Sequence, residues 1–287
     1  MIHRPIHLLY FITGKPMRIV SFNTNSIRVR LHQLEAVIKT HAPEVISIQE
    51  TKATDEDFPV DAIADLGYHA EYFGQKTHYG VAMLSKTAPV DVIKGLPGED
   101  EHAQRRFIAG TYDLPGMGSV TIMNGYFPQG ENRKHPTKFA NKVLFYRGLT
   151  NLLKNQFNPE QPLLLMGDMN IAPLDSDIGI GEDNRKRWLR DGKTSFLPEE
   201  RAWLSEISNW GLIDTYRALH PDAADTFSWF DYRSRGFERE PRRGLRIDLI
   251  MASRPMQDKL TAAGVDTKVR GMTKPSDHCP IWAEFSA

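Results

Sequence analysis

Cysteine is almost absent from this sequence, which has a single thiol, Cys279, among 287 residues. One cysteine excludes an intrachain disulfide and a metal site built from thiolates. Such a chain suits a reducing compartment, and we expect it to be cytoplasmic. No apolar run approaches the ~20 residues that a membrane-spanning helix needs, so we expect no membrane partner.

Net charge is also lacking, because 36 Lys and Arg residues balance 36 Asp and Glu residues. No overall basic field therefore marks a nucleic-acid partner, and such a partner would have to bind at local basic patches. The composition, with 40% apolar and 25% charged residues, is that of a globular protein with a sizeable core. We expect a monomer.

The chain shows no composition break that would divide it into several domains. Residues 1–16 hold only a short apolar patch without a cleavage site, so a signal peptide is not indicated. We interpret residues 1–16 as an N-terminal extension without catalytic residues. From residue 17 to residue 287 the helix and strand patterns continue, which predicts one domain.

Short apolar runs with strand character alternate with amphipathic stretches. The runs are Arg18–Phe22, Val45–Ile48, Gly80–Leu84, Phe107–Tyr112, Ser119–Met123, Leu163–Met166, Ile247–Met251 and Ile281–Phe285. Helices are predicted over Leu31–Ile38, with Asn25 and Ser26 as cap candidates, over Phe139–Leu152, and from Pro198 onward. This mixture predicts an α/β fold with helices covering sheets.

Polar residues of one chemical kind stand at the ends of several predicted strands. They are Asn23, Glu50, Asp168 and Asp248. Ligand sites of α/β proteins usually lie at such strand ends. If the chain stays extended, Asp168 and Asn170 project on one face and offer a base or metal ligand beside an amide. A simple Gly-Asp-x-Asn turn explains the same residues equally well.

Two further groups of residues could carry chemistry. Glu50 ends an apolar run, where a carboxylate is costly unless it is solvated, paired or metal-bound. His278 follows Asp277 and could transfer a proton or donate to a phosphate, although a lone histidine is more often structural. Asp248 could orient His278, or it could simply pair with Arg246. Tyr126 could donate to a phosphate oxygen.

Basic and aromatic residues interleave in two segments, 184–190 and 227–246. The second segment carries six arginines between residues 233 and 246. Cationic side chains neutralise phosphates, and flat rings stack on bases or fill an abasic gap. Core packing of Trp188 and Trp229, and a solvated basic face, are the plainer alternatives. In a chain of zero net charge, the two segments favour nucleic acid.

Taken in order, these segments resemble the exonuclease III family of the endonuclease/exonuclease/phosphatase superfamily, from Met17 to about Phe285. The matching motifs are Ser21–Asn23, Gln49–Lys52, Asn124–Gly130, Gly167–Asn170, Gly179–Glu182, Arg185–Arg190, Trp229–Ser234, Leu245–Asp248 and Ser276–His278. The resemblance implies a four-layer α/β sandwich in which two mixed β-sheets pack face to face with helices outside. It implies abasic-site endonuclease, 3′→5′ exonuclease and 3′-phosphatase activity on double-stranded DNA with abasic sites or blocked 3′ ends. It also implies dependence on Mg²⁺, for which Mn²⁺ can substitute.

The resemblance also implies roles for individual residues. The metal-site residues are Asn23, Glu50, Asp168, Asn170 and Asp277. The catalytic residues are Tyr126, Asp168, Asn170, Asp248 and His278. Asp168 would position and deprotonate the attacking water, and His278, held by Asp248, would donate to a phosphate oxygen. Either Asp168 or His278 could be the general base. The DNA-binding residues are Asn25, Lys52, Arg106, Gln129, Arg185, Lys186, Arg187, Phe227, Trp229 and Leu245, of which the last three match the pocket for a base-less sugar.

Two departures from the family pattern and two other functions remain to be weighed. Ser26 stands where glycine is common, so a positive φ would strain it. Cys279 replaces a small alanine and brings an oxidation liability beside His278.

The other functions are a superfamily phosphatase for lipid or small-molecule phosphates, and a catalytically silent DNA-binding paralogue. The silent paralogue would require a lost metal or base residue, and none is missing.

Overall fold

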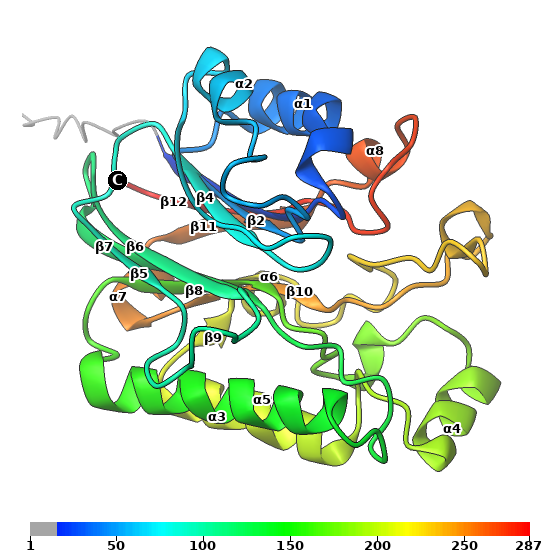
Figure 1. Cartoon of the computed structure of the whole chain (residues 1–287). Coiled ribbons are helices and arrows are strands. Elements are labelled where there is room, and N and C mark those ends of the chain that lie inside the picture. Colours follow the sequence, from blue (N-terminus) through cyan, green and yellow to red (C-terminus); the bar gives the residue numbers. More distant parts are fainter. Residues whose placement is uncertain (1–15) are drawn as a thin grey trace, which may run out of the picture.

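Two six-stranded sheets pack face to face and carry helices on their outer surfaces (Figure 1). The computed structural model describes residues 16–287, so the expected extension lies outside the described residues except for its last position. Both sheets are mixed, with one parallel strand pair in each. The predicted four-layer α/β sandwich is confirmed.

The first sheet joins the beginning of the chain to its end. Its strand order is β11 (Leu260–Val265), β12 (Ile281–Phe285), β1 (Met17–Asn23), β2 (Val45–Gln49), β4 (Val81–Ser85) and β3 (His69–Phe73). The strand β1 runs parallel to β2 and antiparallel to β12. On its outer side lie α1 (Leu31–His41), α2 (Val60–Asp65), the short helix η1 (Ile27–Val29) and α8 (Thr267–Arg270).

The second sheet comes mainly from the middle of the chain. Its order is β5 (Asp91–Lys94), β6 (Phe107–Leu114), β7 (Gly118–Tyr126), β8 (Leu163–Asp168), β10 (Asp248–Ala252) and β9 (Ile213–Asp214). The long helices α3 (Lys138–Gln156) and α5 (Pro198–Trp210) cover its outer face. The shorter elements are η2 (Asp175–Asp177), α4 (Glu182–Asp191), α6 (Thr215–Leu219), η3 (Gly236–Glu238) and α7 (Arg254–Gln257).

Alternation along the strands divides the core into layers. In β8, Leu164 and Met166 pack with Ile19 of β1 in the cluster between the two sheets. Their neighbours Leu163 and Leu165 belong to the cluster beneath α3 and α5. Successive side chains of a strand point to opposite faces, so one apolar run supplies two layers at once. This explains why the run 163–166 has no polar alternation.

The structure confirms each of the eight predicted strand runs but adds strands that the sequence did not reveal. The strands β3 and β5 are mostly half-exposed or exposed edge strands, and polar residues interrupt their apolar pattern. The expected capping of the first helix at Asn25 and Ser26 is wrong. The short helix η1 intervenes, and α1 begins at Leu31 without a side-chain cap. The side chain of Asn25 donates instead to Asp277.

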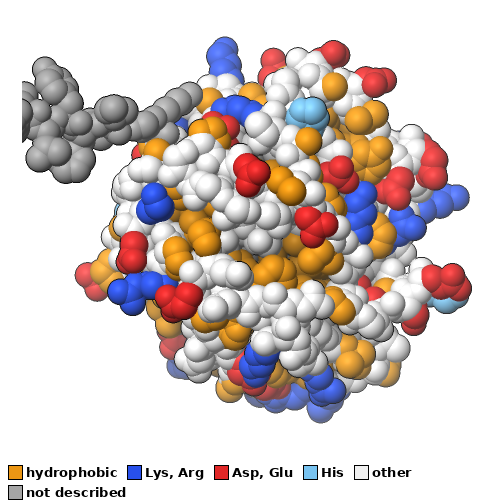
Figure 2. All heavy atoms as spheres, turned by 90° about the vertical axis from the view of Figure 1, so that its left-hand side faces the viewer, with side chains coloured by type: hydrophobic (Ala, Val, Ile, Leu, Met, Phe, Trp, Pro, Cys, Tyr) orange, Lys and Arg blue, Asp and Glu red, His pale blue; other side chains and the backbone are white. Residues whose placement is uncertain are grey.

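The surface mixes charged and apolar side chains, as Figure 2 shows for the face at the left of Figure 1. The exposed large apolar residues of the described chain come from scattered elements: Val29, Val60, Val90, Leu144, Leu174, Leu219 and Tyr232. No helix within residues 16–287 is both long enough and apolar enough to cross a membrane.

A buried ionic network fixes the segment that leads into β10. The Arg246 guanidinium is almost fully buried and pairs with Asp177 at 2.7 Å and with Asp214 at 2.7 Å. Arg217 of α6 pairs with the same Asp177 carboxylate at 2.6 Å. Because Arg246 lies between Leu245 and Ile247, this network also sets the position of those two apolar side chains.

We expect Asp177→Asn to lower the free energy of unfolding by about 3–5 kcal/mol, because two arginines would lose their shared buried counter-charge. Urea denaturation measures this change. Asp258→Asn, which removes an exposed partner of Arg254, is the matched control and should change the stability by less than about 0.5 kcal/mol. Equal stability of both variants would contradict a structural role for the Asp177 network.

Candidate active site

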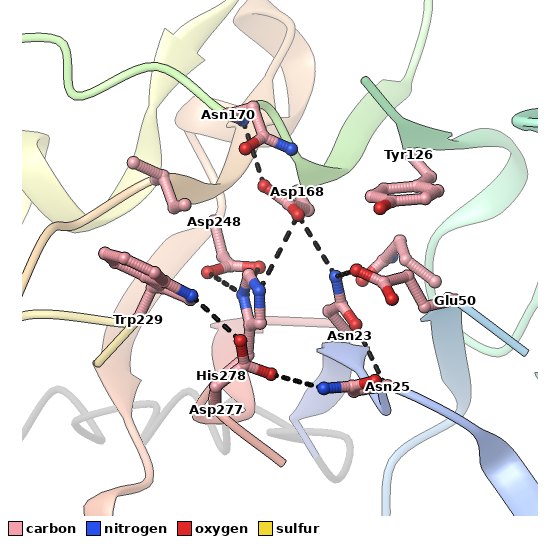
Figure 3. Close-up of polar contacts among 12 residues, drawn as sticks. Asn23, Asn25, Glu50, Tyr126, Asp168, Asn170, Trp229, Asp248, Asp277 and His278 are labelled. Carbon is pink, nitrogen blue, oxygen red and sulfur yellow. Dashed lines mark hydrogen bonds and ion pairs between the residues drawn. The ribbon is translucent and has the colours of Figure 1, made fainter. Parts of the chain in front are cut away.

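The polar residues at the strand ends meet at one edge of the sandwich (Figure 3). Asn23 ends β1, Asp168 ends β8, and Asp248 begins the antiparallel strand β10 directly opposite Asp168. The site therefore draws residues from both sheets. The predicted convergence of strand ends is what the structure shows for these residues.

Asn23 connects the two halves of the site. Its Nδ2 donates to Asp168 Oδ2 at 3.1 Å and to Glu50 Oε1 at 3.1 Å. Its Oδ1 accepts a hydrogen bond from the backbone N–H of Asn25. The amide of Asn23 thus presents its N–H groups to the two carboxylates and holds them in place.

Glu50 follows β2 in a left-handed backbone conformation, with a φ of 51°. Lys52 Nζ lies 2.9 Å from Glu50 Oε2 and 2.5 Å from Asn25 Oδ1. Burial raises the pKa of Glu50, but the Lys52 charge and its hydrogen bond outweigh burial and hold that pKa below its usual range. Glu50 is therefore an ionised carboxylate at neutral pH.

His278 is held in a fixed orientation by Asp248. Its Nδ1–H donates to Asp248 Oδ2 at 2.9 Å and Oδ1 at 3.0 Å. Asp248 in turn accepts from the Ser228 hydroxyl at 2.6 Å. The other ring nitrogen, Nε2, lies 3.8 Å from Asp168 Oδ2. This arrangement fixes the ring and leaves Nε2 facing the site.

Burial and mutual charge shift the pKa values of this pair strongly. Burial lowers the pKa of His278, but the charges of Asp248 and Asp168 outweigh it and raise that pKa to about 10. For Asp168, burial is the largest cause, and with the charges of Asp248 and Glu50 it raises the pKa to about 7 despite the opposing His278 charge. Without a metal, His278 is therefore an imidazolium at neutral pH, and Asp168 titrates near neutrality.

Tyr126 lies at the end of β7 across from Asp168. Arg106 lies between two rings, 4.2 Å from the centre of Tyr79 and 4.4 Å from that of Tyr126, and donates to the Tyr126 carbonyl. Burial and the Glu50 charge, opposed by Arg106, raise the pKa of Tyr126 well above its usual value. Tyr126 thus stays a neutral hydroxyl donor, and buried Arg106 holds it in place through its ring and its carbonyl.

Asn170 follows Asp168 in a turn, with a φ of 52°, rather than in an extended strand. The predicted two-residue alternation is therefore wrong, although both side chains line the same cavity. The Asn170 backbone N–H donates to Asp168 Oδ1, and its Nδ2 donates to the Phe127 carbonyl. The turn interpretation and the expectation that the Asp168 and Asn170 side chains share one site therefore both hold.

A fully buried lysine fixes this turn from below. Lys142 of α3 donates to the Asn170 carbonyl at 2.9 Å and to the Gln129 carbonyl at 3.3 Å. Its counter-ion is buried Glu200 of α5, at 2.6 Å. The second Glu200 oxygen accepts the backbone N–H groups of Ser195 and Leu197. The two helices therefore anchor the loops around Asp168 through one ion pair.

A cavity of about 360 Å³ opens over the site between the acidic residues and an aromatic wall. Trp229 and Leu245 line this cavity, as the resemblance implied, together with Ile247. Phe227 does not line it: its ring packs beneath Gly179 and against Phe230, which buries it behind the wall. The expectation that Phe227 contacts a base-less sugar is therefore corrected.

Asp277, expected near the metal, and Asn25, expected to bind DNA, form a second layer of polar side chains at the site. Asn25 Nδ2 donates to Asp277 Oδ1 at 2.8 Å, and Trp229 Nε1 donates to Asp277 Oδ2 at 3.0 Å. Asp277 thus fixes the Trp229 ring. The cluster of side chains suited to hold a metal comprises Glu50, Asp168 and His278, whose ligand atoms lie within 4.8 Å of one another.

The remaining candidates for DNA binding differ in whether a carboxylate already neutralises their charge. In α4, Arg185 pairs with Glu182 and Asp175, and Lys186 lies 3.5 Å from Glu182. Arg187 contacts only the Asn184 amide. Gln129 is exposed at the cavity rim and donates to Thr194.

The two departures from the family pattern have clear structural settings. Asn25 and Ser26 both have positive φ, 46° and 91°, so Ser26 occupies the strained turn that the sequence comparison anticipated. Its backbone N–H donates to the Glu50 carbonyl, which ties the turn to the metal-site carboxylate. Cys279 is fully buried and burial raises the pKa of its thiol, so it acts as an apolar filler and the expected oxidation liability is not supported.

Sequence reasoning missed Ser228, Lys142 and Glu200, which are buried and hold Asp248 and the loop around Asn170 by hydrogen bonds and an ion pair. Ser228 stood inside a segment interpreted for its aromatic and basic residues. Lys142 lies on a helix predicted from its apolar residues, where a single charge resembles a solvent-facing position, and Glu200 was interpreted only as an acid in the first turn of the helix that begins at Pro198. The pairing of these charges depends on how α3 and α5 pack, which is a tertiary contact.

The donor set fits a hard divalent cation. Glu50 and Asp168 supply carboxylate oxygens, and Asn23 already holds them side by side. His278 Nε2 faces the same space, while its Nδ1 is held by Asp248. Carboxylate oxygens held side by side in this way are the ligands that hard divalent cations prefer in proteins.

Comparison with known proteins agrees with this site. Residues 20–278 match the model of the Endonuclease/Exonuclease/phosphatase family. Exodeoxyribonuclease III of Haemophilus influenzae is 51% identical over 269 residues, which cover 94% of this chain and 100% of that protein.

Two solved structures share the fold. The 3′ phosphatase NExo from Neisseria, bound to a product DNA hairpin, is 36% identical with a TM-score of 0.84, covering 94% of this chain and 99% of that one. An AP endonuclease from Archaeoglobus fulgidus is 31% identical with a TM-score of 0.84 and covers the same shares. The chain therefore belongs to the Endonuclease/Exonuclease/phosphatase family, and within it to the exonuclease III branch.

Proposed function

We propose that this protein is a metal-dependent DNA-repair nuclease that cuts the phosphodiester on the 5′ side of an abasic site and trims 3′ ends. The observation that carries the proposal is the meeting of Glu50, Asp168 and His278 within 4.8 Å at the floor of a cavity walled by Trp229. Acidic groups and an imidazolium suit a phosphodiester, and the aromatic wall suits a sugar without a base.

The pKa shifts support distinct roles for the two candidate bases. At neutral pH Asp168 is poised to accept a proton from water, because its pKa lies near 7. His278 cannot accept one, because it is already protonated, and its Nε2–H is placed to donate to a non-bridging phosphate oxygen. We therefore assign Asp168 as the general base. The water oxygen bonds to phosphorus and its proton passes to Asp168, while the bond from phosphorus to the 3′ oxygen breaks; the 3′ oxygen leaves with the electron pair and takes a proton from solvent to become a hydroxyl.

The other residues orient these groups and the substrate. Asn170 would hold the water beside Asp168, and the neutral Tyr126 hydroxyl would donate to the phosphate. Mg²⁺, or Mn²⁺ in its place, would be held chiefly by Glu50, with Asn23, Asp168 and Asp277 nearby. A bound cation of this type supplies positive charge for the phosphate and the departing 3′ oxygen.

Trp229, Leu245 and Ile247 give the cavity a hydrophobic wall that a base-less deoxyribose could contact. A normal nucleotide carries its base into the same space, so abasic specificity would follow from the size of the pocket. The related proteins named above as an exodeoxyribonuclease, a 3′ phosphatase and an AP endonuclease support this substrate class. The lipid and small-molecule phosphatase reading gains no comparable support from the site.

We further propose that the protein acts as a cytoplasmic monomer. The large exposed apolar side chains of the described residues belong to separate helices, strands and loops, which favours a chain that acts without a permanent partner.

The first test is cleavage of a duplex that carries one abasic site. We expect incision on the 5′ side with magnesium or manganese and none with a chelator. Asp168→Asn should lower kcat by about 10²–10⁴-fold while DNA binding persists, because the lost base acts only in the reaction. An intact abasic duplex beside rapid hydrolysis of inositol phosphates would show that the enzyme is a small-molecule phosphatase.

Lys142 provides a second test, because it acts through the Asn170 and Gln129 carbonyls. We expect Lys142→Met combined with Glu200→Gln, which removes both buried charges, to lower kcat by roughly tenfold or more with little change in KM. Lys154→Met on the same helix is the exposed control. A double variant that folds, as judged by thermal unfolding, and turns over normally would contradict this positioning role.

The protonation of His278 provides a third test. In the metal-free protein, nitrogen NMR should show a charged ring across neutral pH that loses its proton near pH 10. Because the folded pKa is raised, the charged ring stabilises the fold below the ordinary histidine pKa, and this contribution is lost as the pH rises through about 10. Asp248→Asn should lower the pKa of His278. A ring that is neutral at pH 8 in the wild-type protein would exclude the assigned role.

A further inference from the structure

A second cavity, of about 220 Å³, adjoins the catalytic cavity. Trp188, Lys193, Trp229 and Asp231 line both cavities, so the two form one continuous groove. At one end of the groove lie the carboxylates Glu50 and Asp168. The far end is lined by cationic side chains instead: Arg187, Lys193, Arg239 and Arg243.

These four cations, which we call the basic end of the groove, are free of counter-ions. None of them forms an ion pair with a carboxylate anywhere in residues 16–287. Arg187 contacts the Asn184 amide, and Arg239 donates to the Ser234 carbonyl. Lys193 lies 3.7 Å from the centre of the Trp188 ring. Their charge is thus available to a ligand.

The neighbouring arginine on the same helix contrasts with the basic end of the groove. Arg185, on the same helix as Arg187, is neutralised by Glu182 and Asp175. Positive charges clustered around one cavity repel one another, and a bound anion would relieve this repulsion, so the groove favours an anionic ligand.

The single carboxylate in this lining does not cancel the cluster. Both oxygens of Asp231 accept backbone N–H groups, from Arg233 and Ser234, which closes the turn after Trp229. Burial, with the nearby Arg187 charge, lowers the pKa of Lys193 although Asp231 opposes the shift. One acid thus faces four cations, and the local charge remains positive.

We propose that the basic end of the groove binds a second phosphate of the same DNA strand whose scissile phosphate lies at Asp168. This proposal rests on the nuclease function and adds a phosphate subsite to it. Guanidinium groups bind phosphate oxygens with paired hydrogen bonds, which favours phosphate over other anions. The shared wall of Trp188 and Trp229 places this phosphate beyond the sugar pocket, so the subsite would set the register of the strand. The phosphate can be an internal linkage or a terminal 5′-phosphate.

The test removes a phosphate charge from the DNA in one set of measurements and arginine charges from the protein in another. Binding of abasic duplexes is measured by fluorescence anisotropy in chelator, with a neutral methylphosphonate placed in turn at each linkage near the abasic site. A separate pair of duplexes carries or lacks a 5′-phosphate next to that site. The protein variants are Arg239→Gln/Arg243→Gln and the control Arg147→Gln/Arg254→Gln, which removes the same charge from exposed positions elsewhere.

We expect the groove variant to bind more weakly on every duplex, with a salt slope lower by about 1 for each lost phosphate contact. One neutral linkage, or loss of the 5′-phosphate, should weaken the wild-type protein and the control several-fold but leave the groove variant unaffected. Which of the two changes has this effect identifies the phosphate as internal or terminal.

Two results would overturn the subsite. The groove variant could show the wild-type affinity and salt slope, or it could respond to every neutral linkage as the wild-type protein does. Incision by the wild-type protein in magnesium is assayed separately. Normal incision with no effect of the groove variant therefore rejects the subsite alone, whereas absent incision rejects the nuclease function.

Discussion

The site depends on one hydrogen bond that crosses between the two sheets, from Asn23 of β1 to Asp168 of β8. Asn23 and Asp168 come from strands that share no backbone pairing. Their contact requires the sheets to pack in one register, which the apolar cluster between them enforces. A shift of this packing would separate Glu50 from Asp168. The hydrophobic core is therefore what brings the acidic groups into chemical range.

Charge balance within the site explains why so many buried ionisable groups are tolerated. Each acid has a specific partner: Glu50 has Lys52, Asp248 has His278, and Asp277 accepts from Asn25 and Trp229. Asp168 lies 3.8 Å from the His278 ring and has no cationic partner within hydrogen-bonding distance. Its burial, together with the charges of Asp248 and Glu50, raises its pKa to about 7, so this carboxylate can exchange a proton at neutral pH.

Sequence patterns predicted the central strands and the acidic residues because both depend on local chemistry. The run 163–166 identified β8, and its end identified Asp168. Edge strands such as β3 were missed because their stability comes from a neighbouring strand and not from their own pattern. Phe227 was misplaced because sequence alone does not tell which ring of an aromatic segment faces a cavity. Lys142 was missed because only the packing of α3 on α5 reveals its partner Glu200.

The order of strands in the first sheet has a consequence for how the protein is made. The strand β1, the first in the chain, is completed by β12, the last, and His278 lies just before β12. A ribosome-bound chain that lacks the final segment has Glu50 and Asp168 but neither the histidine nor the strand that closes the sheet. Assembly of the active centre therefore waits for residues 276–285, and a chain cut short before them lacks both the catalytic imidazole and the strand that pairs with β1.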